Sequence, residues 1–144
     1  MDDGRRIEHL LYLYAERIDA GDFQGVGELF SGGQIVGPDG NVIARGSAEV
    51  QGLYESSTRL YECGTPCTQH MTTNAIIEVE ESGLSAQGRA RVTVFQSLPD
   101  FPLQPIFFNH SATTQIYPLS LVNPLRIYGI LSLPYPEVTL DNFS

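Results

Sequence analysis

The chain has 144 residues, of which 17 are acidic and 8 basic, and its formal net charge is −9 at pH 7. This length suits one ordinary domain, which buries roughly two-thirds of the surface of its unfolded chain. Every basic residue is an Arg, and these are scattered rather than grouped, which argues against binding to a phosphate backbone. We therefore expect a single domain, residues 1–144, without a nucleic-acid partner.

The composition also excludes several chemistries. The chain has no Lys, so it offers neither a Schiff-base amine nor a Walker-type phosphate loop, and no glycine-rich dinucleotide motif follows a strand. The N-terminus becomes polar too soon for a signal peptide, and no later apolar run reaches the roughly 20 residues of a bilayer span. We expect a cytoplasmic protein that needs no cofactor and has no membrane partner.

The first third of the chain carries helical patterns. Apolar residues at steps of three and four predict a helix from about Asp3 to Ala20, namely Ile7, Leu10, Leu11, Tyr14 and Ile18. Asp22 is a good N-cap for a short second helix, which the sequence "SGG" ends. Residues 34–46 then read as two short strands around a Pro-Asp-Gly turn.

A third helix and a set of strands follow. We expect Ser47 to cap the helix, which fades near Tyr61 and turns four apolar residues inward: Val50, Leu53, Tyr54 and Leu60. "MTTNAIIEVE" and "LSAQGRARVTVFQ" are strand-like runs, and the second places small and apolar residues on one face: Ala86, Gly88, Ala90, Val92 and Val94. "TTQIYPLSLV" and "LRIYGILSL" also suit strands. Helices followed by strands indicate an α+β fold.

Four segments in this order carry a family resemblance: "YAERIDAGDFQGVGELF", "PDGNVIARG" leading into "SAEVQGLYE", "GTPCTQHMTTNAIIEVE" and "VFQSLPDFPLQPI". Over roughly residues 7–106 the chain resembles the SnoaL-like branch of the nuclear transport factor 2 (cystatin-like cone) superfamily. The resemblance implies a cone-shaped, curved, mostly antiparallel sheet packed on three N-terminal helices. After about Phe107 the chain departs from the family pattern, which usually includes a Trp-containing final strand, whereas this chain has no Trp.

The resemblance also implies an active-site pair. Family enzymes that use an Asp-His pair carry the Asp near the end of the first helix and the His at the start of the strand after the third helix. Asp19 and His70 occupy these places, and Asn74 matches an Asn that follows the His. Independently of the family, an Asp that accepts from one ring nitrogen fixes the His tautomer and makes the other nitrogen a general base.

Further residues are candidates for the pocket. The hydroxyls of Tyr14, Tyr54 and Tyr61 would hold a carbonyl oxygen, and His110 would contribute if its strand turns it inward. Two alternatives remain open for the pair itself. Asp19 would otherwise cap the turn into the second helix, and His70 would be structural.

The pattern of the strand also raises an objection to the pair. In an unbroken strand His70 shares a face with Thr72 and Asn74, whereas Ala75 and Ile77 lie on the opposite, more apolar face. Either a bulge re-aims His70, or the polar face lines the cavity.

Cys63, Cys67 and His70 form C-x3-C-x2-H, which suggests zinc. A structural zinc needs four ligands, and no second cluster completes the set, since His110 is remote in sequence and His9 is expected on the polar face of the first helix. We expect no metal and two reduced cysteines.

The family includes cyclases, isomerases, dehydratases and dehydrohalogenases beside members without a known reaction. The resemblance therefore implies a cofactor-independent lyase or isomerase acting on a small ring-bearing substrate through Asp19 and His70. The alternative is a non-catalytic protein that binds a small apolar or aromatic ligand or acts as a dimeric interaction protein. The resemblance makes a homodimer the expected assembly in both cases.

Overall fold

The computed structural model describes residues 2–37, 39–98, 101–117 and 126–131, with side chains up to Leu98. Two helices come first, two short strands follow, and the third helix precedes the four remaining described strands. In chain order the elements are α1 (Asp3–Asp19), α2 (Phe23–Leu29), β1 (Gln34–Val36), β2 (Val42–Arg45), α3 (Gly46–Ser57), β3 (Thr68–Val79), β4 (Ala86–Leu98), β5 (Phe101–Tyr117) and β6 (Arg126–Leu131).

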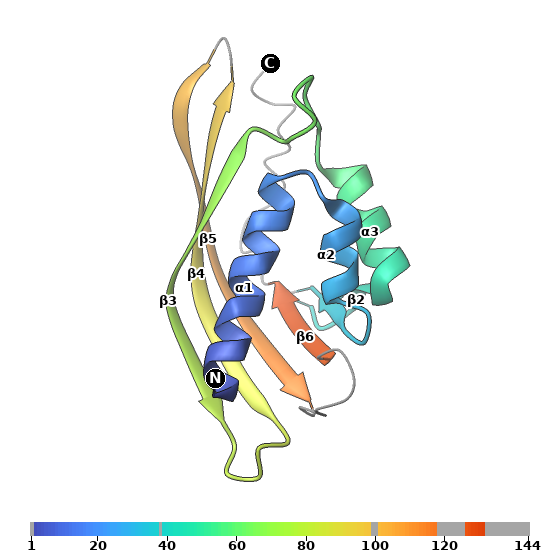
Figure 1. Ribbon diagram of the computed structural model, residues 1–144, viewed down its shortest axis with the longest axis vertical. Helices are drawn as coiled ribbons and strands as arrows, with labels where there is room; N and C mark the ends of the chain where they lie inside the picture. The colour runs from blue at the N-terminus through green and yellow to red at the C-terminus, as the bar shows by residue number, and fades with distance from the viewer. Residues whose placement is uncertain (1, 38, 99–100, 118–125, 132–144) are drawn as a thin grey trace.

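The six strands form one sheet in the order β2-β1-β6-β5-β4-β3. Within the described residues, only β1 and β6 pair in parallel, and the other four neighbouring pairs are antiparallel. Figure 1 shows the long strands β3, β4 and β5 curving around α1, with α2 and α3 on the far side of α1. The predicted α+β fold with a curved, mostly antiparallel sheet and three N-terminal helices is confirmed.

The first two helices form as the sequence predicts. Asp2 caps α1 by accepting a hydrogen bond from the backbone nitrogen of Arg5 at 2.9 Å. Asp22 caps α2 in the same way, because its carboxylate accepts from the backbone nitrogen of Gly25 at 2.9 Å. Asp19 therefore has no capping role in α2.

The predicted start and end of α3 were wrong. Ser47 does not cap the helix, which begins at Gly46. The side chain of Glu49, in the first turn, instead accepts a hydrogen bond from the backbone nitrogen of Arg45 at 2.8 Å. This bond, rather than the Ser47 hydroxyl, satisfies a backbone donor at the start of α3. The helix ends at Ser57, and Leu60 beyond it is 44% exposed rather than turned inward.

The strands β3 and β4 pair from Thr68 opposite Gln96 to Val79 opposite Ala86, with one irregularity between Thr73 and Ile76. Asn74 lies there in the left-handed region, at φ 53°. This bulge shifts the side-chain alternation by one residue. As a result, His70 shares the less exposed face with Ala75 and Ile77, which removes the objection to placing His70 toward the interior.

The main core lies among the helices and the short strands. Its buried members come from α1, α2, β1, β2 and α3 and the residue after α2: Ile18, Val26, Phe30, Ile35, Ala44 and Val50. The helices α2 and α3 approach so closely at Gly27 that an added Cβ would lie 2.5 Å from the carbonyl oxygen of Ser47. Along β4 the face predicted to carry small and apolar residues is the less exposed one, since Ala86, Ala90 and Val94 are buried.

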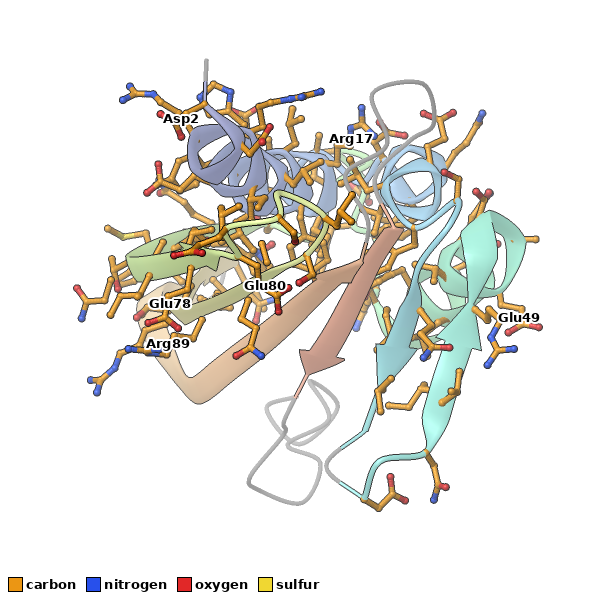
Figure 2. All side chains as sticks on the ribbon, turned by 90° about the horizontal axis from the view of Figure 1, so that it is seen from below. Asp2, Arg17, Glu49, Glu78, Glu80 and Arg89 are labelled. Atoms are coloured by element: carbon orange, nitrogen blue, oxygen red, sulfur yellow. The ribbon has the colours of Figure 1, made fainter. Side chains whose placement is uncertain are left out.

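The outer face of the sheet carries charged side chains beside exposed apolar ones such as Met71 and Ile76 of β3. Glu78 and Arg89 lie on the side of the sheet away from α1 (Figure 2), where their side chains form an exposed ion pair at 3.8 Å. Among the described residues, no helix has the length and apolar character that crossing a membrane requires.

Candidate active site

The candidate site forms where the end of α1 meets the start of β3 (Figure 1). Asp19 is the last residue of α1, and His70 is the third residue of β3. Their side chains are 21% and 15% exposed respectively, so both are largely withdrawn from solvent without being sealed off. Packing of α1 against β3 thus joins two residues that are 51 positions apart in the sequence.

Asp19 accepts three hydrogen bonds from β3. Its Oδ1 atom lies 2.6 Å from Nδ1 of His70 and 2.9 Å from the Thr68 hydroxyl. Its Oδ2 atom accepts from the backbone nitrogen of His70 at 2.7 Å. Both carboxylate oxygens are therefore held, and the carboxylate fixes the strand backbone as well as the imidazole ring.

This arrangement determines the tautomer of His70. A carboxylate only accepts hydrogen bonds, so the proton between Oδ1 and Nδ1 belongs to the ring. In the neutral imidazole the lone pair then lies on Nε2. A His held in this way combines a fixed orientation with a basic nitrogen, and the adjacent carboxylate stabilises the positive charge that the ring gains when Nε2 takes a proton.

Tyr14 and Tyr54 form a second polar group in the interior, with their hydroxyl oxygens 2.5 Å apart. Burial raises the pKa of Tyr14 to about 12; the bond from Tyr54 opposes this shift, and the charge of Asp19 adds to it. The pKa of Tyr54 is raised well above its ordinary value by burial and by Tyr14. Both hydroxyls are therefore protonated at neutral pH; one donates to the other, and the second keeps its proton available for another acceptor.

The rings of these tyrosines belong to an aromatic cluster. Tyr14 meets the edge of Phe30 at a centroid distance of 6.4 Å, and Tyr54 stacks on Phe23 at 6.3 Å. Such contacts fix ring positions and hence the positions of the hydroxyls. Asp19 raises the pKa of Tyr14, so the Tyr14 hydroxyl lies within electrostatic range of the Asp19 carboxylate.

Among the described side chains, no hydrogen bond joins Tyr61 or Asn74 to the Asp-His pair. Tyr61 lies in the loop after α3, where its ring stacks under the Arg59 guanidinium at 4.9 Å. Asn74 is exposed at the β3 bulge. His110 is opposite Val92 in the β4–β5 register, and its side chain lies outside the described residues.

Sequence reasoning missed Thr68 as a member of the site. Thr68 precedes His70 by two residues on the same strand, so both side chains point to the same face. This spacing of two residues was the sequence signal that could have placed Thr68 in the site. His9 is exposed on α1, as predicted.

The cysteines and His70 do not form a metal cluster. The two sulfur atoms of Cys63 and Cys67 lie 3.6 Å apart as free thiols, whereas Nδ1 of His70 is bonded to Asp19. In the part of the chain that the structure describes, no three His, Cys, Asp or Glu side chains gather closely enough to hold a metal ion.

Solved structures with the same fold come from several bacteria. A nuclear transport factor 2-like protein with a cystatin-like fold from Novosphingobium aromaticivorans matches with a TM-score of 0.69 and 17% identity, covering 97% of this chain and 87% of its own. An Asp-to-Asn variant of Rv3472, a protein of unknown function from Mycobacterium tuberculosis, matches with a TM-score of 0.66 and 23% identity, covering 88% and 69%.

A third structure, from Novosphingobium aromaticivorans, is provisionally assigned as a scytalone dehydratase; it matches with a TM-score of 0.64 and 15% identity over 88% of this chain and 80% of its own. At these identities the likeness concerns the fold. No curated protein matches the chain in sequence. The SnoaL-like domain family, by contrast, matches residues 1–116. Because this match spans most of the 144 residues, the chain belongs to the SnoaL-like domain family.

Proposed function

We propose that the protein is a cofactor-independent lyase or isomerase that uses His70 as a general base on a small ring-bearing substrate. The observation that carries this proposal is the 2.6 Å contact between Asp19 Oδ1 and His70 Nδ1, which leaves Nε2 as the proton acceptor. The second bond of Asp19, to the backbone of His70, holds the ring and its partner in one geometry. Family membership supports the same class of reaction.

The reaction would begin at a carbon next to a carbonyl. Nε2 removes a proton from that carbon, and the electron pair moves onto the carbonyl oxygen. Whichever hydroxyl of the Tyr14–Tyr54 pair has a free proton donates to that oxygen, since both groups are neutral and Tyr14 is within electrostatic range of Asp19. Expulsion of a neighbouring hydroxide or halide gives a lyase product, whereas return of the proton to another carbon gives an isomer. A dehydration of this type fits the assignment of one structural neighbour.

The aromatic surroundings support a ring-bearing substrate. The rings of Tyr14 and Tyr54 contact Phe30 and Phe23 respectively. Aromatic side chains of this kind favour flat apolar ligands. The proposed ligand is therefore a compact cyclic ketone or hydroxyketone, a small apolar or aromatic molecule with one carbonyl.

The test is proton exchange in D2O. The protein is incubated with a panel of cyclic ketones and β-hydroxyketones, and deuterium incorporation or loss of water is followed by NMR. We expect a reacting compound to lose roughly 10²- to 10⁴-fold in rate with His70→Gln, the usual contribution of a general base. His9→Gln is the matched control, because His9 is exposed on α1. Undiminished exchange with His70→Gln would refute the proposed role.

A second candidate function is association through the sheet, with a homodimer as the assembly. β3 stands at one end of the strand order and leaves two large apolar side chains exposed on its outer face, with Met71 at 45% and Ile76 at 44%. Sedimentation of the intact chain tests this, and we expect a dimer that Met71→Glu with Ile76→Glu converts to monomer. A monomeric wild type would contradict it.

A further inference from the structure

The loop between α3 and β3 holds both cysteines of the chain next to each other. Their sulfur atoms are 3.6 Å apart, so the two free thiols are in contact but form no disulfide bond. Since the chain contains no other cysteine, any disulfide within one molecule must join this pair. Cys63 is exposed, whereas Cys67 is partly covered.

The two thiols differ in a way that assigns them different roles. Hydrogen bonding to Thr65, followed by the contact with Cys67, lowers the pKa of Cys63. Burial and the contact with Cys63 raise the pKa of Cys67. An accessible thiol with a lowered pKa is the one that attacks an external disulfide, and a covered thiol in contact with it is placed to resolve the product.

The Cys67 end of the loop is tied to β4. The backbone nitrogen of Ser97 donates to the Cys67 carbonyl at 3.0 Å, and the side-chain amide of Gln96 donates to the Pro66 carbonyl at 3.3 Å. Both bonds tie the Cys67 end to β4. Because the Cys67 end is held to β4 and the Cys63 side chain is exposed, we expect the Cys63 side chain to move more readily when the gap between the sulfurs closes.

From this geometry we infer that Cys63 and Cys67 are a thiol–disulfide exchange site that takes a low-molecular-weight disulfide as its oxidant, and that its state is transmitted to Thr68. The Cys63 thiolate attacks one sulfur of the oxidant, forms a mixed disulfide and releases one thiol. The Cys67 thiolate then attacks the Cys63 sulfur and releases the second thiol. Two electrons pass from the cysteines to the oxidant, and two protons go to the released thiols.

The transmission follows from chain connectivity. Cys67, at φ 57° in the left-handed region, directly precedes Thr68, whose hydroxyl donates to Asp19. On the other side of the loop, Gly64 packs against the turn after α1, where an added Cβ on Gly21 would lie 2.4 Å from the Gly64 carbonyl oxygen. A change in the Cys63–Cys67 distance therefore acts on a segment that reaches Asp19 through Thr68 and packs on the turn after α1 through Gly64.

The experiment uses the intact chain and oxidised glutathione. We expect the wild type to lose both free thiols, to lose the mass of two hydrogen atoms, to keep no glutathione and to run as a single chain on a non-reducing gel. Cys67→Ser should retain one glutathione on Cys63, and Cys63→Ser should react more slowly by roughly an order of magnitude, because exchange follows access and thiolate fraction. Glutathione that stays on the wild type, or disulfide-linked dimers, would overturn the inference.

Backbone amide spectra of the wild type test the transmission without any substrate. On oxidation we expect the amide signals of Thr68 and His70 to shift and that of Gly25, which is bonded to Asp22 in α2, to stay in place. Reduction with dithiothreitol should restore the first spectrum. Stationary Thr68 and His70 signals in a fully oxidised sample would overturn the link to the Asp-His pair. Neither readout depends on catalytic activity, so failure here is distinguishable from failure of the proposed reaction.

Discussion

Replacing Asp19 by Asn changes the donors and acceptors of the site without changing its shape. The backbone nitrogen of His70 can only donate, so the Asn carbonyl oxygen must take the place of Oδ2. The Asn amide then occupies the place of Oδ1, opposite His70 Nδ1 and the Thr68 hydroxyl. The amide donates to both, which requires Nδ1 to lose its proton and Nε2 to gain one.

Asp19→Asn should cost both stability and activity. Three bonds to a carboxylate become neutral bonds, and charge-assisted bonds contribute about 1.5–3 kcal/mol against about 1 kcal/mol for neutral ones. The difference is about 0.5–2 kcal/mol for each bond, so we expect a loss of about 1.5–6 kcal/mol in the free energy of unfolding. Tautomer inversion of this kind costs on the order of 10⁴ in kcat in a Ser-His-Asp hydrolase. A loss of similar size is expected here, because a protonated Nε2 cannot accept the substrate proton.

The tautomer is measured by 15N NMR of the labelled imidazole, in which protonated and bare ring nitrogens resonate far apart. We expect a proton on Nδ1 of His70 in the wild type and on Nε2 in Asp19→Asn. Asp22→Asn is the matched control: it makes the same chemical change at a carboxylate that accepts from Gly25, and should leave the His70 spectrum unchanged. Retention of the Nδ1 proton in Asp19→Asn would refute the reasoning.

The remaining predictions concern stability and are checked by urea unfolding. Thr68→Val removes one hydrogen-bond donor to the Asp19 carboxylate and should lower the free energy of unfolding by about 1 kcal/mol, whereas Thr68→Ser should recover most of this loss. An unchanged urea midpoint for Thr68→Val would contradict the hydrogen bond between Thr68 and Asp19. Above pH 10 Tyr14 loses its proton in the unfolded chain but keeps it in the folded protein up to about pH 12, so this residue should lower the free energy of unfolding by about 1.4 kcal/mol per pH unit. Tyr14→Phe should make this decline with pH less steep. An equal slope of unfolding free energy against pH in both proteins would be inconsistent with the raised pKa of Tyr14. Val50→Ala, at a fully buried position, should cost about 2 kcal/mol, against less than about 0.5 kcal/mol for Val42→Ala at a position 43% exposed; equal losses would argue against the core as described. Asn74→Gly should leave the free energy of unfolding nearly unchanged, whereas Asn74→Val should lower it by about 1 kcal/mol, because the backbone φ of 53° at position 74 disfavours a branched side chain. Equal stability of the two variants would rule out the bulge.

Local patterns predicted the helices and the strand faces because burial repeats at the period of each element. The apolar stripe of α1, the Asp22 cap of α2 and the small-residue face of β4 are all of this kind. The entrance to α3 was not predictable in this way. Ser47 and Glu49 both offer acceptors there, and only the path of the chain at Gly46 decides between them.

The candidate site was predictable only in part. Family resemblance pointed to Asp19 and His70, but the alternation of β3 argued against an inward His70 until the bulge at Asn74 was seen. A bulge depends on pairing with β4, which a single strand sequence does not encode. Thr68 was overlooked because a strand Thr has many ordinary roles, and its bond to Asp19 follows from the packing of α1 on β3.

The central claim is that His70 accepts a proton from the substrate. The most direct measurement is the ratio of kcat/KM between His70→Gln and His9→Gln on the first compound that exchanges with deuterium. We predict that the ratio is roughly 10⁻² to 10⁻⁴, since only one of the two imidazoles is held by a carboxylate in the interior. A ratio near one would contradict the claim and leave the Asp19–His70 contact as a structural bond between α1 and β3.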